Sequence, residues 1–115
     1  MAKKATLKPE APRWEDRKTS QTRGIEDRLR AAGFERVDAY RYNSASIRVR
    51  VIDRRFEGMP TPDREDLVFE VIDKLPKRTK EDIILLLIMA PSELQRRNPL
   101  LSVNQDFENP LPSLL

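Results

Sequence analysis

Two residue types are missing from this chain of 115 residues: cysteine and histidine. Without cysteine there can be no disulfides, thiol nucleophiles or thiolate metal sites. Without histidine there are no imidazole ligands and no side chain whose ordinary pKa lies near neutrality. We therefore expect a protein that is not an enzyme, needs no cofactor and holds no metal cluster.

Glycine is scarce, and long apolar runs are absent. The three glycines, Gly24, Gly33 and Gly58, form neither a phosphate-binding loop nor the Gly-x-x-Gly loop with which KH domains clamp nucleic acid. The longest apolar stretch, residues 83–91, is too short to span a bilayer, and no apolar run follows the first six residues. Together with the lack of cysteine, this predicts a cytoplasmic protein without a membrane partner.

The formal net charge of +3 is unevenly distributed. Residues 1–23 hold seven basic and three acidic side chains, whereas residues 24–94 hold thirteen basic and fourteen acidic ones. The excess positive charge therefore lies in the N-terminal arm. Such an arm can raise affinity for phosphates or an anionic surface, or it can act simply as a solubilising segment.

Three regions follow from composition and periodicity. Residues 1–20 form a flexible basic arm, residues 21–97 an α/β domain, and residues 98–115 an irregular tail rich in Asn, Pro and Ser. Trp14 is the exception within the arm. It either pins the arm onto the domain or stands exposed as an anchor for a partner.

The apolar pattern predicts the secondary structure of the domain. Apolar side chains recur at helical spacing in two segments and at strand spacing in three. The predicted elements are helices over 22–32 and 61–75, strands over 36–42, 45–53 and 83–90, and a short helix over 91–94.

Two of the strands differ in their expected exposure. In the second strand, Ile47, Val49 and Val51 alternate with Arg48 and Arg50, which predicts one buried face and one face open to water. The third strand is apolar at every position from 83 to 90, as is typical of a central strand covered on both sides.

This order of elements, and several residues within it, resembles the BolA family. The points of likeness are residues 25–29 at the start of the first helix, residues 47–51 in the second strand, the turn at 56–58, Arg64 early in the second long helix, and residues 91–93 after the third strand. The resemblance implies an α+β fold related to class II KH domains, a three-stranded mixed sheet with helices packed on it in the order α-β-β-α-β-α.

The sequence departs from that family at the residues that carry its chemistry. Members of the family hold a shared iron–sulfur cluster, with a monothiol glutaredoxin as partner, through a histidine in an Arg-His-Arg pattern. Here Glu65 follows Arg64 at that place, and Asp82 stands where many members have a second histidine. Carboxylates are poor substitutes for imidazole on such a cluster. The departure implies that no cluster is bound.

The second strand and its neighbour supply one candidate binding surface. Arg48 and Arg50 share a face by strand periodicity, Tyr40 and Tyr42 can join it from the first strand, and Arg54 and Arg55 lie at its edge. Arginine beside tyrosine on an open sheet can pair with phosphates and stack on bases. Alternatively, these residues pair across strands for stability, with Asp38 and Asp53 neutralising their charge.

Two charged clusters have similar alternatives. The carboxylates Asp63, Glu65 and Asp66 can hold a hard divalent cation or act in hydrolysis, but at the start of a helix they also complement its dipole. Lys74, Lys77, Arg78 and Lys80 can contact a protein or RNA, or they can complement the dipole at the helix end.

These observations predict a binding or adaptor module whose partner is another protein or a second copy of the chain. The candidate surface comprises Tyr40, Tyr42, Arg48, Arg50, Arg54, Arg55, Arg64 and Glu65. The alternative is a nucleic-acid-binding or ribosome-associated protein that uses the Arg/Tyr face and the basic arm.

Overall fold

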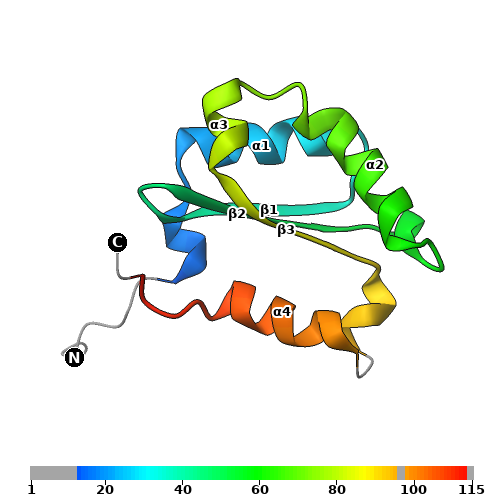
Figure 1. Ribbon diagram of the computed structural model, residues 1–115. Helices are drawn as coiled ribbons and strands as arrows, with labels where there is room; N and C mark the ends of the chain where they lie inside the picture. The colour runs from blue at the N-terminus through cyan, green and yellow to red at the C-terminus, as the bar shows by residue number, and fades with distance from the viewer. Residues whose placement is uncertain (1–12, 96–97, 114–115) are drawn as a thin grey trace, which may run out of the picture.

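The computed structural model describes residues 13–95 and 98–113, which form three layers (Figure 1). One face of the sheet carries α1, α2 and α3, and the opposite face carries α4 and the N-terminal 3₁₀ turn η1. The elements in chain order are η1 (Trp14–Arg17), α1 (Ser20–Ala31), β1 (Arg36–Asn43), β2 (Ser46–Ile52), η2 (Arg54–Phe56), α2 (Thr61–Ile72), α3 (Lys77–Asp82), β3 (Ile83–Met89), η3 (Pro91–Leu94) and α4 (Pro99–Glu108).

Local signals fix the ends of the predicted elements. Thr19 and Thr22 form a reciprocal capping box at the start of α1. Gly33 ends that helix with φ of 101°, and Gly58 turns the chain after η2 with φ of 71°, conformations that favour glycine. The predicted bounds of α1 and of the three strands agree with the structure within two residues.

The sheet has the order β1-β2-β3. β1 and β2 form an antiparallel hairpin, and β3 lies parallel to β2 on its other side. The prediction that residues 83–90 form a central strand is therefore wrong: β2 is central and β3 is at the edge. The apolar pattern of β3 has a different cause, because helices cover both faces of this edge strand.

The main core lies between the sheet and the helices α1 and α2. Alternate residues of β2, Ile47, Val49 and Val51, are fully buried on this face as predicted, and they pack against Ile25 and Val68 from the two helices. The connection after α2 differs from the expectation. The helix ends at Ile72 rather than residue 75, and the predicted connection over 77–82 forms the short helix α3.

The second face of the sheet is covered as well, which corrects two predictions. Residues 99–108, expected to belong to an irregular tail, form α4, and this helix closes a second core over the face of β2 that was expected to be open to water. Phe107 of α4 is fully buried there beside Tyr40, Leu87 and Met89. None of the described helices is long and apolar enough to cross a membrane.

The N-terminal segment adds to this second core. The Trp14 ring lies 5.8 Å from the Tyr40 ring and 5.5 Å from the Phe107 ring, centroid to centroid. Of the two roles considered for Trp14, the structure supports the one that pins the arm onto the domain. Residues 14–20 of the predicted flexible arm are thus held in η1 and the start of α1, whereas residues 1–12 lie outside the described residues.

Truncating Phe107 tests whether α4 is part of the folded core. We expect Phe107→Ala to lower the free energy of unfolding by about 3–5 kcal/mol, because it removes a fully buried aromatic ring. The control, Leu111→Ala, changes a side chain that is 71% exposed and should stay within about 0.5 kcal/mol of wild type. Equilibrium urea unfolding measures both. Equal, negligible effects would mean that α4 does not close the core.

Candidate functional site

The four residues of the predicted Arg/Tyr face do lie together, but they are covered. Tyr40 is opposite Arg48 across the β1–β2 ladder, and Asp38 is opposite Arg50. Arg50 and Tyr40 are both 0% exposed, while Arg48 and Tyr42 are partly buried. The interpretation of this face as an open surface is therefore wrong, since α4 and η1 lie over it (Figure 1).

Arg50 is the centre of the covered face. Its two terminal nitrogens donate hydrogen bonds to Asp38 (2.8 Å) on the neighbouring strand and to Asn104 (2.9 Å) and Glu108 (2.7 Å) on α4. Its guanidinium carbon lies 4.7 Å from the centroid of the Phe107 ring. A buried charge is tolerated only when it is paired and hydrogen-bonded, and Arg50 meets both conditions through groups from two layers.

Arg48 binds α4 in the same way, with weaker geometry. Its Nη1 lies 3.4 Å from both the carbonyl and a carboxylate oxygen of Asp106, and its guanidinium lies 3.9 Å from the Tyr42 ring centroid. Asp106 and Glu108 stand in the last turn of α4, where the helix dipole disfavours negative charge. The sheet arginines supply the compensating positive charge, which favours packing of this turn against the sheet.

The tyrosines also bind the C-terminal segment through the backbone. The Tyr40 hydroxyl donates to the Phe107 carbonyl (2.8 Å), and the Tyr42 hydroxyl donates to the Leu111 carbonyl (2.7 Å). Burial raises the pKa of Tyr40, an effect that its hydrogen bond from Arg48 partly offsets. The structure thus favours the alternative in which the Arg/Tyr pairs and Asp38 stabilise the sheet.

The remaining basic residues of the predicted surface pair locally. Arg54 is bound to Glu35 (2.8 Å), and Arg55 is bound to Asp53 (3.2 Å) while it lies over the Phe34 ring. Burial alone would raise the pKa of Asp53. The hydrogen bonds from the Arg55 side chain and backbone have a larger combined effect in the opposite direction, so the pKa of Asp53 lies below its ordinary value. Both arginines therefore anchor the turn after β2.

Arg64 connects distant turns instead of joining the Arg/Tyr face. It donates two hydrogen bonds to the Glu93 carboxylate (2.8 and 2.9 Å) and one to the Met59 carbonyl (2.8 Å). Beside it, Glu57 accepts from the hydroxyl (2.6 Å) and the amide (3.1 Å) of Ser92. These residues line a groove of about 530 Å³. They include several of the BolA-like residues, so those positions hold the β2–α2 turn against η3.

Neither position of the missing histidines forms a metal site. Glu65 is exposed on α2, and Asp82 accepts a hydrogen bond from Arg41 (2.7 Å). Within residues 13–95 and 98–113, no group of three or more acidic, cysteine or histidine side chains is arranged to hold a metal ion. The cluster of Asp63, Glu65 and Asp66 is consistent with its dipole interpretation at the start of α2.

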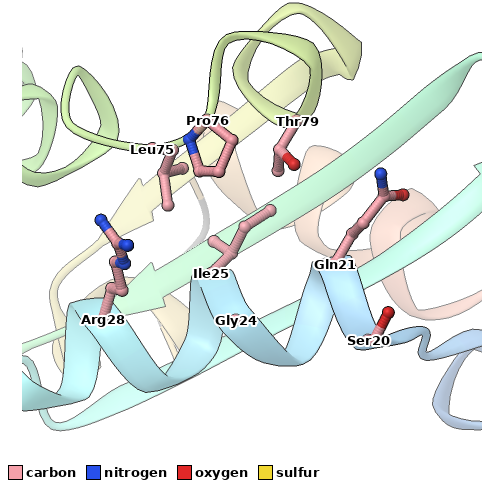
Figure 2. Close-up of a pocket in the computed structure, with 8 residues that line it drawn as sticks. All are labelled: Ser20, Gln21, Gly24, Ile25, Arg28, Leu75, Pro76 and Thr79. Carbon is pink, nitrogen blue, oxygen red and sulfur yellow. The ribbon is translucent and has the colours of Figure 1, made fainter.

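A small pocket lies between α1 and the α2–α3 connection (Figure 2). It measures about 230 Å³, with the buried Ile25 between Gln21 and Arg28 on the α1 side and Leu75 and Pro76 opposite. A side chain at Gly24 would meet no atom within 4 Å, which explains the hollow. The pocket has no charged group aimed into it besides the rim residue Arg28, which is already bound to the Lys74 carbonyl (3.0 Å).

An apolar groove of similar size lies along the edge of β3. It measures about 240 Å³ and is formed by Phe69 and Ile72 of α2, Lys80 of α3, and residues 83–86. Phe69 is 41% exposed and Ile84 is 60% exposed, which makes them two of the three exposed large apolar side chains among the described residues. We call this surface, defined by Phe69, Ile72, Lys80 and residues 83–86, the edge groove.

The edge groove had no direct sign in the sequence. Residues 83–86 and Ile72 were expected to be core, because an apolar strand and an apolar helical stripe normally are, whereas Lys80 was assigned to a basic cluster. One signal was available: Phe69 lies outside the stripe of Leu67, Val68, Val71 and Ile72 that faces the sheet. A large aromatic side chain off the buried face of an amphipathic helix becomes informative only where other exposed apolar groups gather beside it.

The arrangement of elements defines the class of fold. It is an α+β fold in which a three-stranded mixed sheet is covered by helices in the order α-β-β-α-β-α, which confirms the predicted class. The chain matches no protein-family model and no curated protein sequence. Among solved structures it is similar to the solution structure of the BolA1 protein from Mus musculus, with a TM-score of 0.52 and 19% identity over 83% of this chain and 81% of that one. The fold is BolA-like.

Removing the charge of Asp38 tests the pairing of Arg50. We expect Asp38→Asn to lower the free energy of unfolding by about 1.5–3 kcal/mol, because it weakens a hydrogen bond to a buried charge. Asp27→Asn, on the exposed side of α1, is the control and should change stability by less than about 0.5 kcal/mol. Chemical denaturation compares the two variants. A loss of unfolding free energy no larger than that of the control would mean that Asp38 does not stabilise the buried charge of Arg50.

The Arg64–Glu93 pair predicts an acid dependence of stability. The hydrogen bond from Arg64, aided by that from the Ala90 amide, lowers the pKa of Glu93 below its ordinary 4.5 even though partial burial raises it. A lowered pKa stabilises the fold above pH 4.5 and loses this effect as the pH falls through the folded-state value. Glu93→Gln should therefore flatten the loss of stability below pH 4.5, measured by thermal unfolding across pH. Glu65→Gln, which removes a carboxylate of α2 but leaves Arg64 paired, is the control; an identical flattening in it would contradict the assignment.

Proposed function

We propose that this protein is a non-enzymatic binding module that recognises another protein chain through the edge groove. The observation that carries the proposal is the exposure of Phe69 and Ile84, which both line that groove. Exposed apolar groups that gather around a hollow are the usual mark of a protein contact, whereas single scattered ones are not.

The position of β3 supports the same function. An edge strand carries unpaired backbone N–H and C=O groups, and proteins normally guard such edges with charge, proline or a covering element. Residues 83–89 contain neither charge nor proline. A partner chain can therefore find both backbone hydrogen-bonding groups and apolar contacts along this strand.

Among the described residues, the Arg/Tyr face does not offer the open surface that the nucleic-acid alternative was expected to use. Arg50 of that face is 0% exposed, and its two terminal nitrogens donate to Asp38, Asn104 and Glu108. The basic residues of the arm before residue 13 lie outside the described residues. For this reason we propose one function and no second candidate.

Affinity capture from native extract tests the proposal. We expect the full chain to retain a protein, including an untagged copy of itself, and the variant Phe69→Asp/Ile84→Asp to retain about tenfold less or lower still. Leu111→Asp, which changes the third exposed apolar side chain outside the groove, should retain as much as wild type. Retention of no protein, or equal retention by all three forms, would refute the proposed function.

A further inference from the structure

We infer that the occupant of the edge groove is a second copy of this chain, bound about a two-fold axis so that the two β3 strands pair antiparallel. This inference rests on the proposed function and names its partner. Three features of the molecule support it: the edge of β3, the side chains that project there and the charges that flank them.

One residue of β3 has no partner in the β2–β3 ladder. Ile47 pairs with Ile83 and Arg48 pairs with Leu85, so that Ile84 lies opposite no residue of β2. Such an irregularity re-aims the side chain of the extra residue. Ile84 therefore projects at the edge, 60% exposed, while residues 85–89 continue as a regular strand that pairs with β2 alone among the described strands, with the Ile88 carbonyl on the outer side bound by Arg64.

The helix beside this edge runs opposite to β3. The first turn of α2 lies near the end of β3, where Arg64 donates to the Ile88 carbonyl (3.4 Å). The last turn of α2, with Ile72, lies near the start of β3, where it lines the edge groove with residues 83–86. In an antiparallel β3 pair, the acidic start of one α2 would therefore approach the end of α2 and α3 in the other copy.

The charges on these two ends are opposite. The exposed residues Glu65 and Asp66 lie in the first half of α2, and the exposed residues Lys74 and Arg78 lie after its end. Within residues 13–95 and 98–113, none of these four side chains takes part in an ion pair. A two-fold axis places the acidic pair of each copy beside the basic pair of the other, so that the same contact occurs twice. The same arrangement buries Phe69 and Ile84 of both copies.

The mass of the purified full chain in solution tests the inference. Analytical ultracentrifugation across a concentration series should show a monomer–dimer equilibrium. Because each substitution occurs twice in the dimer, Phe69→Asp or Ile84→Asp should raise the dimer dissociation constant by about 100-fold or more. Leu111→Asp should leave it unchanged. Circular dichroism and urea unfolding verify that the variants, both at exposed positions, remain folded.

Charge exchange tests the two-fold geometry itself. Glu65→Lys/Asp66→Lys sets base against base, and Lys74→Glu/Arg78→Glu sets acid against acid, so that each variant alone should dimerise more weakly than wild type. A mixture of the two variants restores both attractive contacts and should form a heterodimer. A mixture that stays as weak as its components would overturn the arrangement.

Failure of this inference and failure of the proposed function give different results. A chain that remains monomeric up to about 1 mM, or a dimer insensitive to both apolar substitutions, overturns self-association. If that monomer still captures a different protein in a manner that depends on Phe69 and Ile84, the edge groove binds another chain and the proposed function stands. If it captures none, both are overturned.

Discussion

The buried guanidinium of Arg50 is the constraint on which the arrangement of this protein depends. A positive charge with no exposed surface must be paired, and its carboxylates come from β1 and from α4. Glu108 of α4 pairs with Arg50 and Asp106 pairs with Arg48, and both carboxylates stand in a helix turn where the dipole disfavours negative charge. These pairs favour the position of α4 against this face of the sheet.

Because α4 covers the second face, both faces of the sheet are packed against helices. The candidate binding surface therefore lies at the edge of the sheet. The polar groups that looked most capable of binding are used in internal contacts: Arg48 and Arg50 hold α4, and Arg64 holds η3. The exposed apolar side chains Phe69 and Ile84 instead line the edge groove beside β3. This explains how a chain rich in charge can present a largely hydrophobic candidate site.

Local patterns in the sequence predicted most of the fold. The helical spacing in α1, the alternation in β2 and the apolar run of β3 act over a few residues, and the structure follows them. The errors concern contacts between residues far apart. Asn98 and Pro99 do mark a helix start, and Leu100, Val103 and Phe107 share one face of it, but the irregular composition around them hid that pattern. Whether the Arg/Tyr face is open depends on α4. The exposure of β3 depends on the strand order of the sheet, and the spacing of apolar residues does not determine that order.

The distance along the chain between Arg50 and its helical partner bears on biosynthesis. The two residues of the Arg50–Glu108 pair are 58 positions apart, and translation supplies the arginine first. A nascent chain that ends before α4 therefore presents a basic, aromatic sheet surface that the finished protein conceals. The pairing of Arg50 and the covering of this face are therefore completed only once α4 has been translated.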